Sequence, residues 1–214
     1  MPNGPLTLPA RLCLLAWGVA RPAAGGAAHR PAPVRAGALV ELARRSLLTD
    51  EDGIATPADL DTNTGDAVLD GLLELVRESY PHPWRTWVTL RARVTLDAVR
   101  EQLVAEGYLR AEKRRVLGVF PSVEYALERT AAVERLREET RQVLRGPLPV
   151  ADISERDAAL AVLANAAGLL RESTPGRRAE ELTERAAAAT PGLRGIVREL
   201  STAVTAGAAV AASP

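Results

Sequence analysis

The chain has 214 residues, of which 47% are hydrophobic and 25% charged, values that are ordinary for one well-buried globular domain. Its formal net charge is zero, so the chain as a whole is no polycation, and any anion binding has to come from local charge asymmetry. Cys13 is the single cysteine, which excludes an internal disulfide, a zinc finger or a redox pair within one chain.

Hydrophobic periodicity predicts a mainly α-helical fold. Leu69, Leu72, Leu73 and Val76 recur at the spacing of one helix face, and Pro81 ends that pattern. Further helices are predicted over residues 6–19, 33–48, 95–106, 122–144, 154–171, 178–189 and 193–204. Residues 84–94 fit either a short helix or a strand. We expect one compact helical domain over residues 6–204, followed by a disordered tail of small residues over 205–214.

Caps and breaks define several of these boundaries. Ser154 with Asp157 resembles a capping box, Thr95 is a candidate N-cap, and Gly107 is a natural residue at which a helix ends. Residues 21–33 are rich in Pro, Gly and Ala and are predicted to form a loop. The acidic residues 49–66 are predicted to be mostly loop, with a short hairpin around Gly53.

A projecting β-hairpin is predicted after Gly107. Its arms would be residues 108–111 and 116–120, with a charged turn over 112–115 that contains Arg114 and Arg115. The second arm would carry an apolar edge formed by Val116, Leu117, Val119 and Phe120. A basic turn beside an apolar edge suits a membrane surface, but it equally suits a dimer contact or a hairpin packed in the core.

Charge is distributed unevenly along the chain. Residues 50–78 carry nine acidic side chains against Arg77 alone, and residues 85–115 carry eight basic side chains against four acidic ones. Arginine binds phosphate through a planar fork that lysine lacks, and Lys113 is the only lysine in the chain. Solvated helix faces are the alternative interpretation of this asymmetry.

No motif for catalysis is found in the sequence. His82 and His29 lie in Pro-rich loops, and Cys13 lies in an apolar helical run. Asp59, Asp61, Asp66 and Asp70 do not have the spacing of an EF-hand, and Asp66 and Asp70 are interpreted as helix-start residues. The apolar run at residues 12–20 is too short to span a bilayer. We therefore expect a cytoplasmic protein that is no enzyme and has no metal or cofactor.

Four stretches in order resemble the Golgi phosphoprotein 3 family, as found in its short actinobacterial members. They are Leu6-Thr-Leu8, Arg35-Ala-Gly-Ala-Leu-Val-Glu-Leu42, Thr64-Gly-Asp-Ala-Val-Leu-Asp70 and Leu103-Val-Ala-Glu-Gly-Tyr-Leu109. The resemblance implies a helical domain with a projecting hairpin for membrane or oligomer contact. It also implies a peripheral membrane protein that binds phosphatidylinositol 4-phosphate and the tails of glycosyltransferases.

The resemblance also implies where a lipid headgroup would bind. Two arginines of the family's pocket fall on Arg35 and Arg93 of this chain. A third falls on Leu96, which cannot bind an anion, and the family's pocket tryptophan falls near Gly26. His29 and Arg30 lie close to that last position and are the candidate substitutes.

Two other functions remain open at this point. A helix followed by a basic hairpin is also the arrangement of a winged-helix nucleic-acid binder, although Asp97, Glu101 and Glu106 would then face phosphates, so we do not expect nucleic acid as the partner. A protein-binding scaffold without a lipid site is the second alternative. The expected partners are anionic phospholipid headgroups at a membrane surface, with a protein partner and a homo-oligomer through the hairpin as further candidates.

Overall fold

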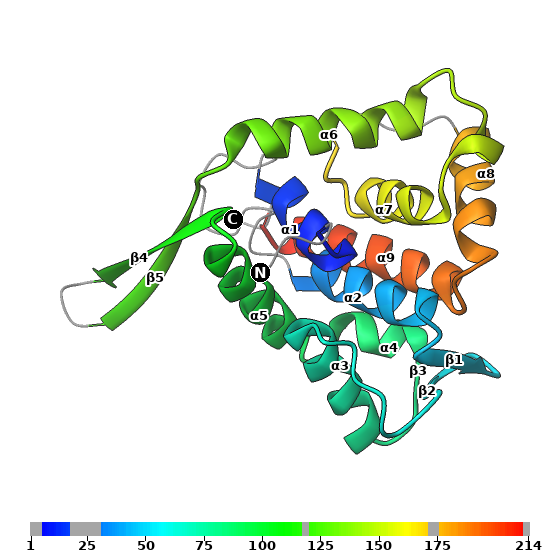
Figure 1. Cartoon of the computed structure of the whole chain (residues 1–214), viewed down its shortest axis with the longest axis horizontal. Coiled ribbons are helices and arrows are strands. Elements are labelled where there is room, and N and C mark those ends of the chain that lie inside the picture. The colour runs from blue at the N-terminus through cyan, green and yellow to red at the C-terminus, as the bar shows by residue number, and fades with distance from the viewer. Residues whose placement is uncertain (1–5, 18–30, 117–119, 171–175, 212–214) are drawn as a thin grey trace.

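The computed structural model describes residues 6–17, 31–116, 120–170 and 176–211, and over these ranges the expected mainly α fold is confirmed (Figure 1). The helices are α1 (Leu8–Trp17), α2 (Pro31–Arg44), α3 (Ala67–Glu78), α4 (Trp84–Thr89), α5 (Ala92–Ala105), α6 (Thr130–Arg145), the 3-10 turn η2 (Val150–Asp152), α7 (Glu155–Ala166), α8 (Gly176–Ala187) and α9 (Leu193–Ala211). The strands are β1 (Leu48–Glu51), β2 (Ile54–Pro57), β3 (His82–Pro83), β4 (Leu109–Val116) and β5 (Phe120–Leu127).

Helix α2 occupies the centre of the helical body. It packs against α1, α3, α4, α5, α7 and α9, and every residue from Pro33 to Ala43 is buried. Helix α1 crosses it closely at Gly37, where a Cβ atom would lie 2.6 Å from Leu12 Cδ1 and 3.0 Å from the Pro9 backbone nitrogen. A helix that is buried on all sides has to satisfy or tolerate any charge that it carries.

Glu41 is one of two charged residues in the buried part of α2, and its carboxylate is fully used. Its Oε2 accepts the backbone N–H of Leu8 at 3.0 Å, which caps the start of α1. Its Oε1 accepts Nε and Nη2 of Arg45 at 3.1 and 3.0 Å, and Nη2 of Arg156 lies 3.7 Å from Oε2. One side chain therefore joins α1 and the end of α2 through charge-assisted hydrogen bonds, and α7 through an ion pair.

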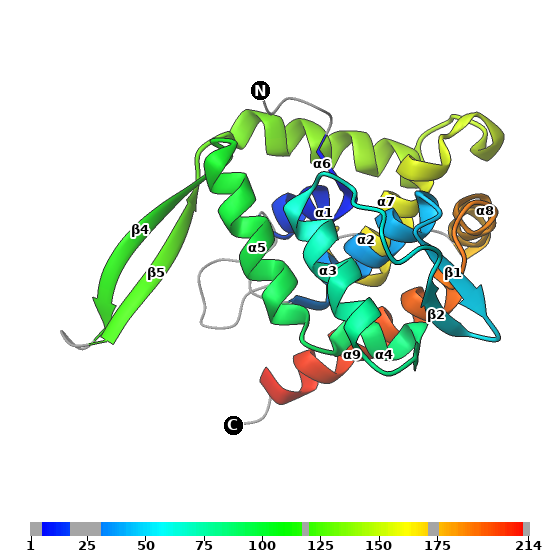
Figure 2. The same ribbon diagram turned by 60° about the horizontal axis from the view of Figure 1, so that its bottom comes forward.

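Two small antiparallel sheets flank the helices. In one sheet β2 pairs with both β1 and β3, and the expected hairpin around Gly53 is confirmed as the β1–β2 connection. In the other sheet β4 pairs with β5 from Leu109–Leu127 to Val116–Phe120. Figures 1 and 2 show this second hairpin extending away from the helical body, as expected, at the end opposite to β1 and β2.

The hairpin differs from its prediction in where it turns. Glu112 to Arg115 pair with Glu124 to Pro121, so they lie in β4 and not in a turn. The arms are eight residues each, and the prediction of a helix from residue 122 is wrong because those residues form β5. A run of four charged residues is typical of a turn, but here the backbone of this run pairs with the opposite strand.

The bounds of three other helices differ from the predicted ones. Helix α5 begins at Ala92, so the expected cap Thr95 is a buried residue of its second turn, and residues 84–89 form the helix α4. Helix α7 ends at Ala166, short of residue 171. Helix α9 continues to Ala211, so residues 205–211 of the expected tail are helical. Ser154 caps α7 as predicted, accepting the Asp157 N–H at 3.0 Å.

We predict that Glu41→Gln lowers the free energy of unfolding by about 1.5–3 kcal/mol, because it removes a buried negative charge that accepts hydrogen bonds from the Leu8 N–H and from Arg45 and pairs with Arg156. Urea denaturation followed by circular dichroism would measure this. The matched control is Glu74→Gln, whose carboxylate is 61% exposed and 3.9 Å from Arg77, and it should change stability by less than about 0.5 kcal/mol. Equal effects of the two substitutions would contradict the structural role of Glu41.

Candidate functional site

Arg35 is the second charged residue of buried α2, and its surroundings are the opposite of those of Glu41. The side chain has 0% exposure. Its Nη2 donates to the carbonyl oxygen of Arg91 at 2.7 Å. Over the part of the chain that the structure describes, its Nε and Nη1 have no hydrogen-bond partner, and no carboxylate pairs with it.

Burial without a counter-charge disfavours the charged form of the Arg35 guanidinium and therefore lowers its pKa. Desolvation by burial and, as the smaller cause, repulsion by the Arg91 guanidinium together lower the pKa of Arg35 to about 10. At neutral pH the group is still a cation. Buried polar groups are nearly always paired in folded proteins, so a core guanidinium with two nitrogens that lack a partner among the described residues requires an explanation.

The side chain of Arg35 points to the start of helix α5. Arg91 precedes α5 in the N-cap position with a left-handed backbone, φ 50°, and makes no side-chain capping bond. The first turn of α5 holds no acidic residue. Uncapped N–H groups at a helix start carry partial positive charge and attract anions.

Arg93 stands in the first turn of the same helix. Its side chain is 77% exposed and its Nε lies 3.8 Å from Asp97 Oδ2, a loose ion pair. Three arginines thus lie at the start of α5. Arg35 reaches it from α2 by a hydrogen bond to the Arg91 carbonyl, and Arg91 and Arg93 are exposed residues of the helix start itself. We call Arg35, Arg91 and Arg93 the arginine cluster.

The structure places the guanidinium of Arg35 beside the backbone of Arg91, near the helix turn that carries Arg93. Arg35 binds the carbonyl of residue 91, two residues before Arg93. Leu96, which stands where the family has a third arginine, is buried in the core. His29 and Arg30 lie outside the described residues. Sequence reasoning missed Arg91, because only the backbone conformation at the α5 start reveals that it contacts Arg35.

The hairpin arginines lie in a strand and not in the predicted turn. Arg114 and Arg115 pair with Ser122 and Pro121 in the strands, and Val116 pairs with Phe120. Leu117 and Val119 lie outside the described residues. The base of the hairpin is held by two cation–π contacts: the Arg100 guanidinium lies 5.1 Å from the Tyr125 ring centroid, and that of Arg129 lies 4.7 Å from the Tyr108 ring centroid.

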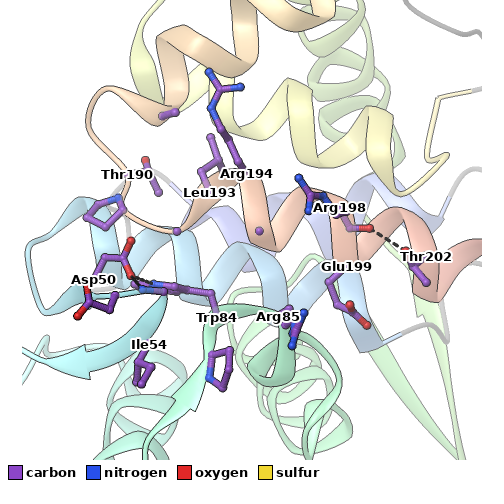
Figure 3. Close-up of a pocket in the computed structure, with 17 residues that line it drawn as sticks. Asp50, Ile54, Trp84, Arg85, Thr190, Leu193, Arg194, Arg198, Glu199 and Thr202 are labelled. Carbon is purple, nitrogen blue, oxygen red and sulfur yellow. Dashed lines mark hydrogen bonds between the residues drawn. The ribbon is translucent and has the colours of Figure 1, made fainter.

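A separate cleft of about 730 Å³, drawn in Figure 3, lies on the side of the helical body opposite to the β4–β5 hairpin (Figures 1 and 2). It is formed by the start of α9, the start of α4 and the β1–β2 turn. Neither Arg35 nor Arg93 lines this cleft. Its side chains include Trp84 and the arginines Arg85, Arg194 and Arg198.

The groups considered for catalysis or metal binding have local roles. Burial raises the pKa of the Cys13 thiol to about 12, so it remains protonated at neutral pH and is a poor nucleophile. Asp66 accepts the N–H groups of Val68 and Leu69 and caps α3, which confirms the helix-start interpretation for that residue. Among the described residues, no three His, Cys, Asp or Glu side chains gather in a way that could hold a metal ion.

Comparison with known proteins identifies the family. A profile of the Golgi phosphoprotein 3 (GPP34) family matches residues 8–209, nearly the whole chain. The chain belongs to this family. A search of curated proteins found no match. None of the described helices is long and apolar enough to cross a bilayer.

We predict that Arg35→Met leaves the free protein as stable as the parent or more stable by about 1 kcal/mol, because it removes an uncompensated buried charge while keeping most of the volume. Urea denaturation of the two proteins would measure the difference. A loss of more than about 2 kcal/mol would mean that the bond to the Arg91 carbonyl is structural and that Arg35 is not held ready for a ligand.

Proposed function

We propose that this chain is a peripheral membrane protein that binds an anionic phospholipid headgroup through the arginine cluster. The observation that carries the proposal is the buried guanidinium of Arg35, whose Nε and Nη1 have no partner among the described residues. A bound phosphate would supply the missing counter-charge and hydrogen-bond acceptors at once. The family match supports the same function, and phosphatidylinositol 4-phosphate is the headgroup that we propose.

The order in which the arginines act follows from their exposure. Arg91 and Arg93 are exposed and would meet the phosphate first. Arg35 is fully covered in the free protein, so the residues over it would have to move before it contacts the ligand. Ligand binding would then return the pKa of Arg35 towards its ordinary value, since the anion offsets both burial and the repulsion from Arg91.

The hairpin is the proposed second contact of the protein, with the membrane or with another copy of the chain. Eight paired residues extend it by roughly 25 Å. Its base is fixed to α5 through Arg100 and Tyr125, and α5 begins at the arginine cluster. One helix therefore sets the position of the hairpin relative to the proposed headgroup site.

A nucleic-acid function receives no support from the charges of α5. Asp97 lies near the middle of this helix, within 3.8 Å of Arg93 and 3.5 Å of Arg100, and would confront a phosphate backbone. Glu101 is exposed one turn further along. A surface that binds nucleic acid usually presents basic and polar groups over the whole contact.

We predict that the protein floats with vesicles of phosphatidylcholine doped with phosphatidylinositol 4-phosphate and not with vesicles of phosphatidylcholine alone. Arg91→Gln and Arg93→Gln should each weaken this binding about fivefold to tenfold, because each removes one cation near the headgroup. Arg35→Met should weaken it by at least as much. Vesicle flotation with quantification of the bound fraction would measure all three variants.

The control is Arg177→Gln in α8, which removes a 91% exposed arginine from another helix and should leave binding unchanged. Equal binding to neutral and anionic vesicles would contradict the proposal. So would full binding by the Arg91 and Arg93 variants, and this second result would favour a protein-binding scaffold in which the arginine cluster has no ligand.

A further inference from the structure

The cleft at the start of α9 has features of a ligand site that the lipid-binding proposal does not use. It is about 730 Å³ in volume, within the range of small-molecule sites in proteins. Figure 3 shows α9 along one side, the β1–β2 turn with Asp50 on another, and Trp84 and Arg85 of α4 below. Figures 1 and 2 place this end of α9 on the side of the helical body opposite to the β4–β5 hairpin.

Helix α9 begins with its positive end open to the cleft. Gly192 has φ +70°, and a Cβ atom there would lie 2.3 Å from Trp84 Cδ2, so the backbone rests on the indole ring and only glycine fits. Glycine offers no capping side chain, and the first turn of α9 contains no acidic residue. The indole ring of Trp84 thus packs directly against the backbone at the start of α9.

The N–H groups of this helix start are without acceptors. The first helical bond is donated by Ile196 to Gly192 O at 3.1 Å, and Leu193 N makes only a 3.4 Å bond to Thr190 O. Within the described residues, the N–H groups of Arg194 and Gly195 have no acceptor. Both residues are exposed and line the cleft.

A buried hydroxyl in the same turn is also without a partner. Thr190 lines the cleft just before Gly192, is 2% exposed, and its Oγ1 makes no hydrogen bond within the part of the chain that the structure describes. A buried, unpaired hydroxyl costs free energy unless a ligand or an ordered water completes it.

Some charged side chains of the cleft already bind other groups of the protein, and others have no close ionic partner among the described residues. Asp50 is occupied, since its Oδ1 accepts the Gly53 N–H at 2.8 Å and the Trp84 indole N–H at 3.1 Å. Arg85 and Arg198 make no ion pair with any described residue, and Arg194 has only a 3.9 Å contact with the exposed Glu184. Asp52 and Glu199 also line the cleft, so its net charge is near zero.

We infer that this cleft binds a small molecule through a phosphate or carboxylate group seated on the start of α9. The uncapped N–H groups of Arg194 and Gly195 would donate to the oxyanion, and Arg85 and Arg198 would supply positive charge from two different helices. Because the lining also carries Asp52 and Glu199, the net charge of the cleft does not favour an anion. Binding depends instead on the N–H groups of the helix start and on the placement of the arginines beside them.

The place of the cleft favours a soluble ligand over a lipid headgroup. It lies at the end of the body away from the hairpin, so a protein that contacts a membrane through the hairpin keeps the cleft towards the solvent. The choice of a soluble ligand rests on the proposed membrane contact of the hairpin, whereas the residues that line the cleft are separate from the arginine cluster.

Gly195 allows a direct test, because a Cβ atom there meets nothing within 4 Å. Gly195→Asp would put a carboxylate on the open helix start and so occupy the oxyanion site from within. The matched control is Gly176→Asp, the same change at the first residue of α8, where a Cβ atom also meets nothing within 4 Å. All proteins would carry Arg35→Met, Arg91→Gln and Arg93→Gln, which together remove the three cations of the arginine cluster as a second phosphate site.

The measurement is thermal unfolding of the full chain against inorganic phosphate, with sodium succinate as a parallel arm at equal ionic strength. We expect the parent and Gly176→Asp to gain about 2–4 °C in Tm in a saturable way with at least one of the two anions. Gly195→Asp should be as stable as the parent without anion and should lose this gain. Arg85→Gln and Arg198→Gln should weaken the apparent affinity about threefold to tenfold.

The two arms identify the ligand chemistry, since a gain with phosphate alone assigns a phosphate and a gain with succinate alone assigns a carboxylate. Absence of any saturable gain in the parent would overturn the inference. A gain that persists in full in Gly195→Asp would overturn it as well, because the anion would then bind elsewhere. Neither result bears on vesicle binding through the arginine cluster, which is measured with Arg35 in place.

Discussion

The fold depends on burying α2 on all sides together with two opposite charges. Glu41 has its full set of partners: the Leu8 N–H, Arg45 and Arg156. Within the ranges that the structure describes, Arg35 has a single partner, the carbonyl oxygen of Arg91. The same helix thus contains a charge whose interactions hold α1 and α7 in place and a charge whose interactions are incomplete. The first is a structural element, and the second is what we propose as the centre of the ligand site.

Helix α5 connects the two features that the proposed function needs. Its first turn carries the exposed members of the arginine cluster, and Arg100 further along contacts Tyr125 at the hairpin base. A helix of 14 residues spans about 21 Å and is stiff, so its start and its end keep a fixed relative position. A headgroup bound at the α5 start would therefore fix the orientation of the hairpin against the membrane or a second subunit.

Local sequence signals predicted the elements that depend on near neighbours. The apolar face of α3, its Asp66 cap, the Ser154 cap and the turn at Gly53 all rest on side chains within a few residues of one another. The hairpin was predicted too, but its turn was placed too early, because the charged residues 112–115 have the composition of a turn while their pairing depends on the opposite strand.

The candidate site depended on contacts that no local pattern contains. Arg35 and Arg93 were predicted from the family resemblance alone, and the partner of Arg35 is 56 residues away in the sequence. Arg91 could not be predicted, since its role follows from a left-handed backbone at the start of α5 and from the burial of Arg35 beneath it. The cleft at α9 likewise arises from Trp84 meeting Gly192, over one hundred residues apart.

The proposed headgroup site requires that a phosphate completes the buried guanidinium of Arg35. A crystal structure with the soluble headgroup, glycerophosphoinositol 4-phosphate, would reveal this contact. We expect a phosphate oxygen within hydrogen-bonding distance of Arg35 Nε or Nη1, with Arg91 and Arg93 on the same phosphate. A headgroup bound elsewhere, with Arg35 still buried and unpaired, would contradict it.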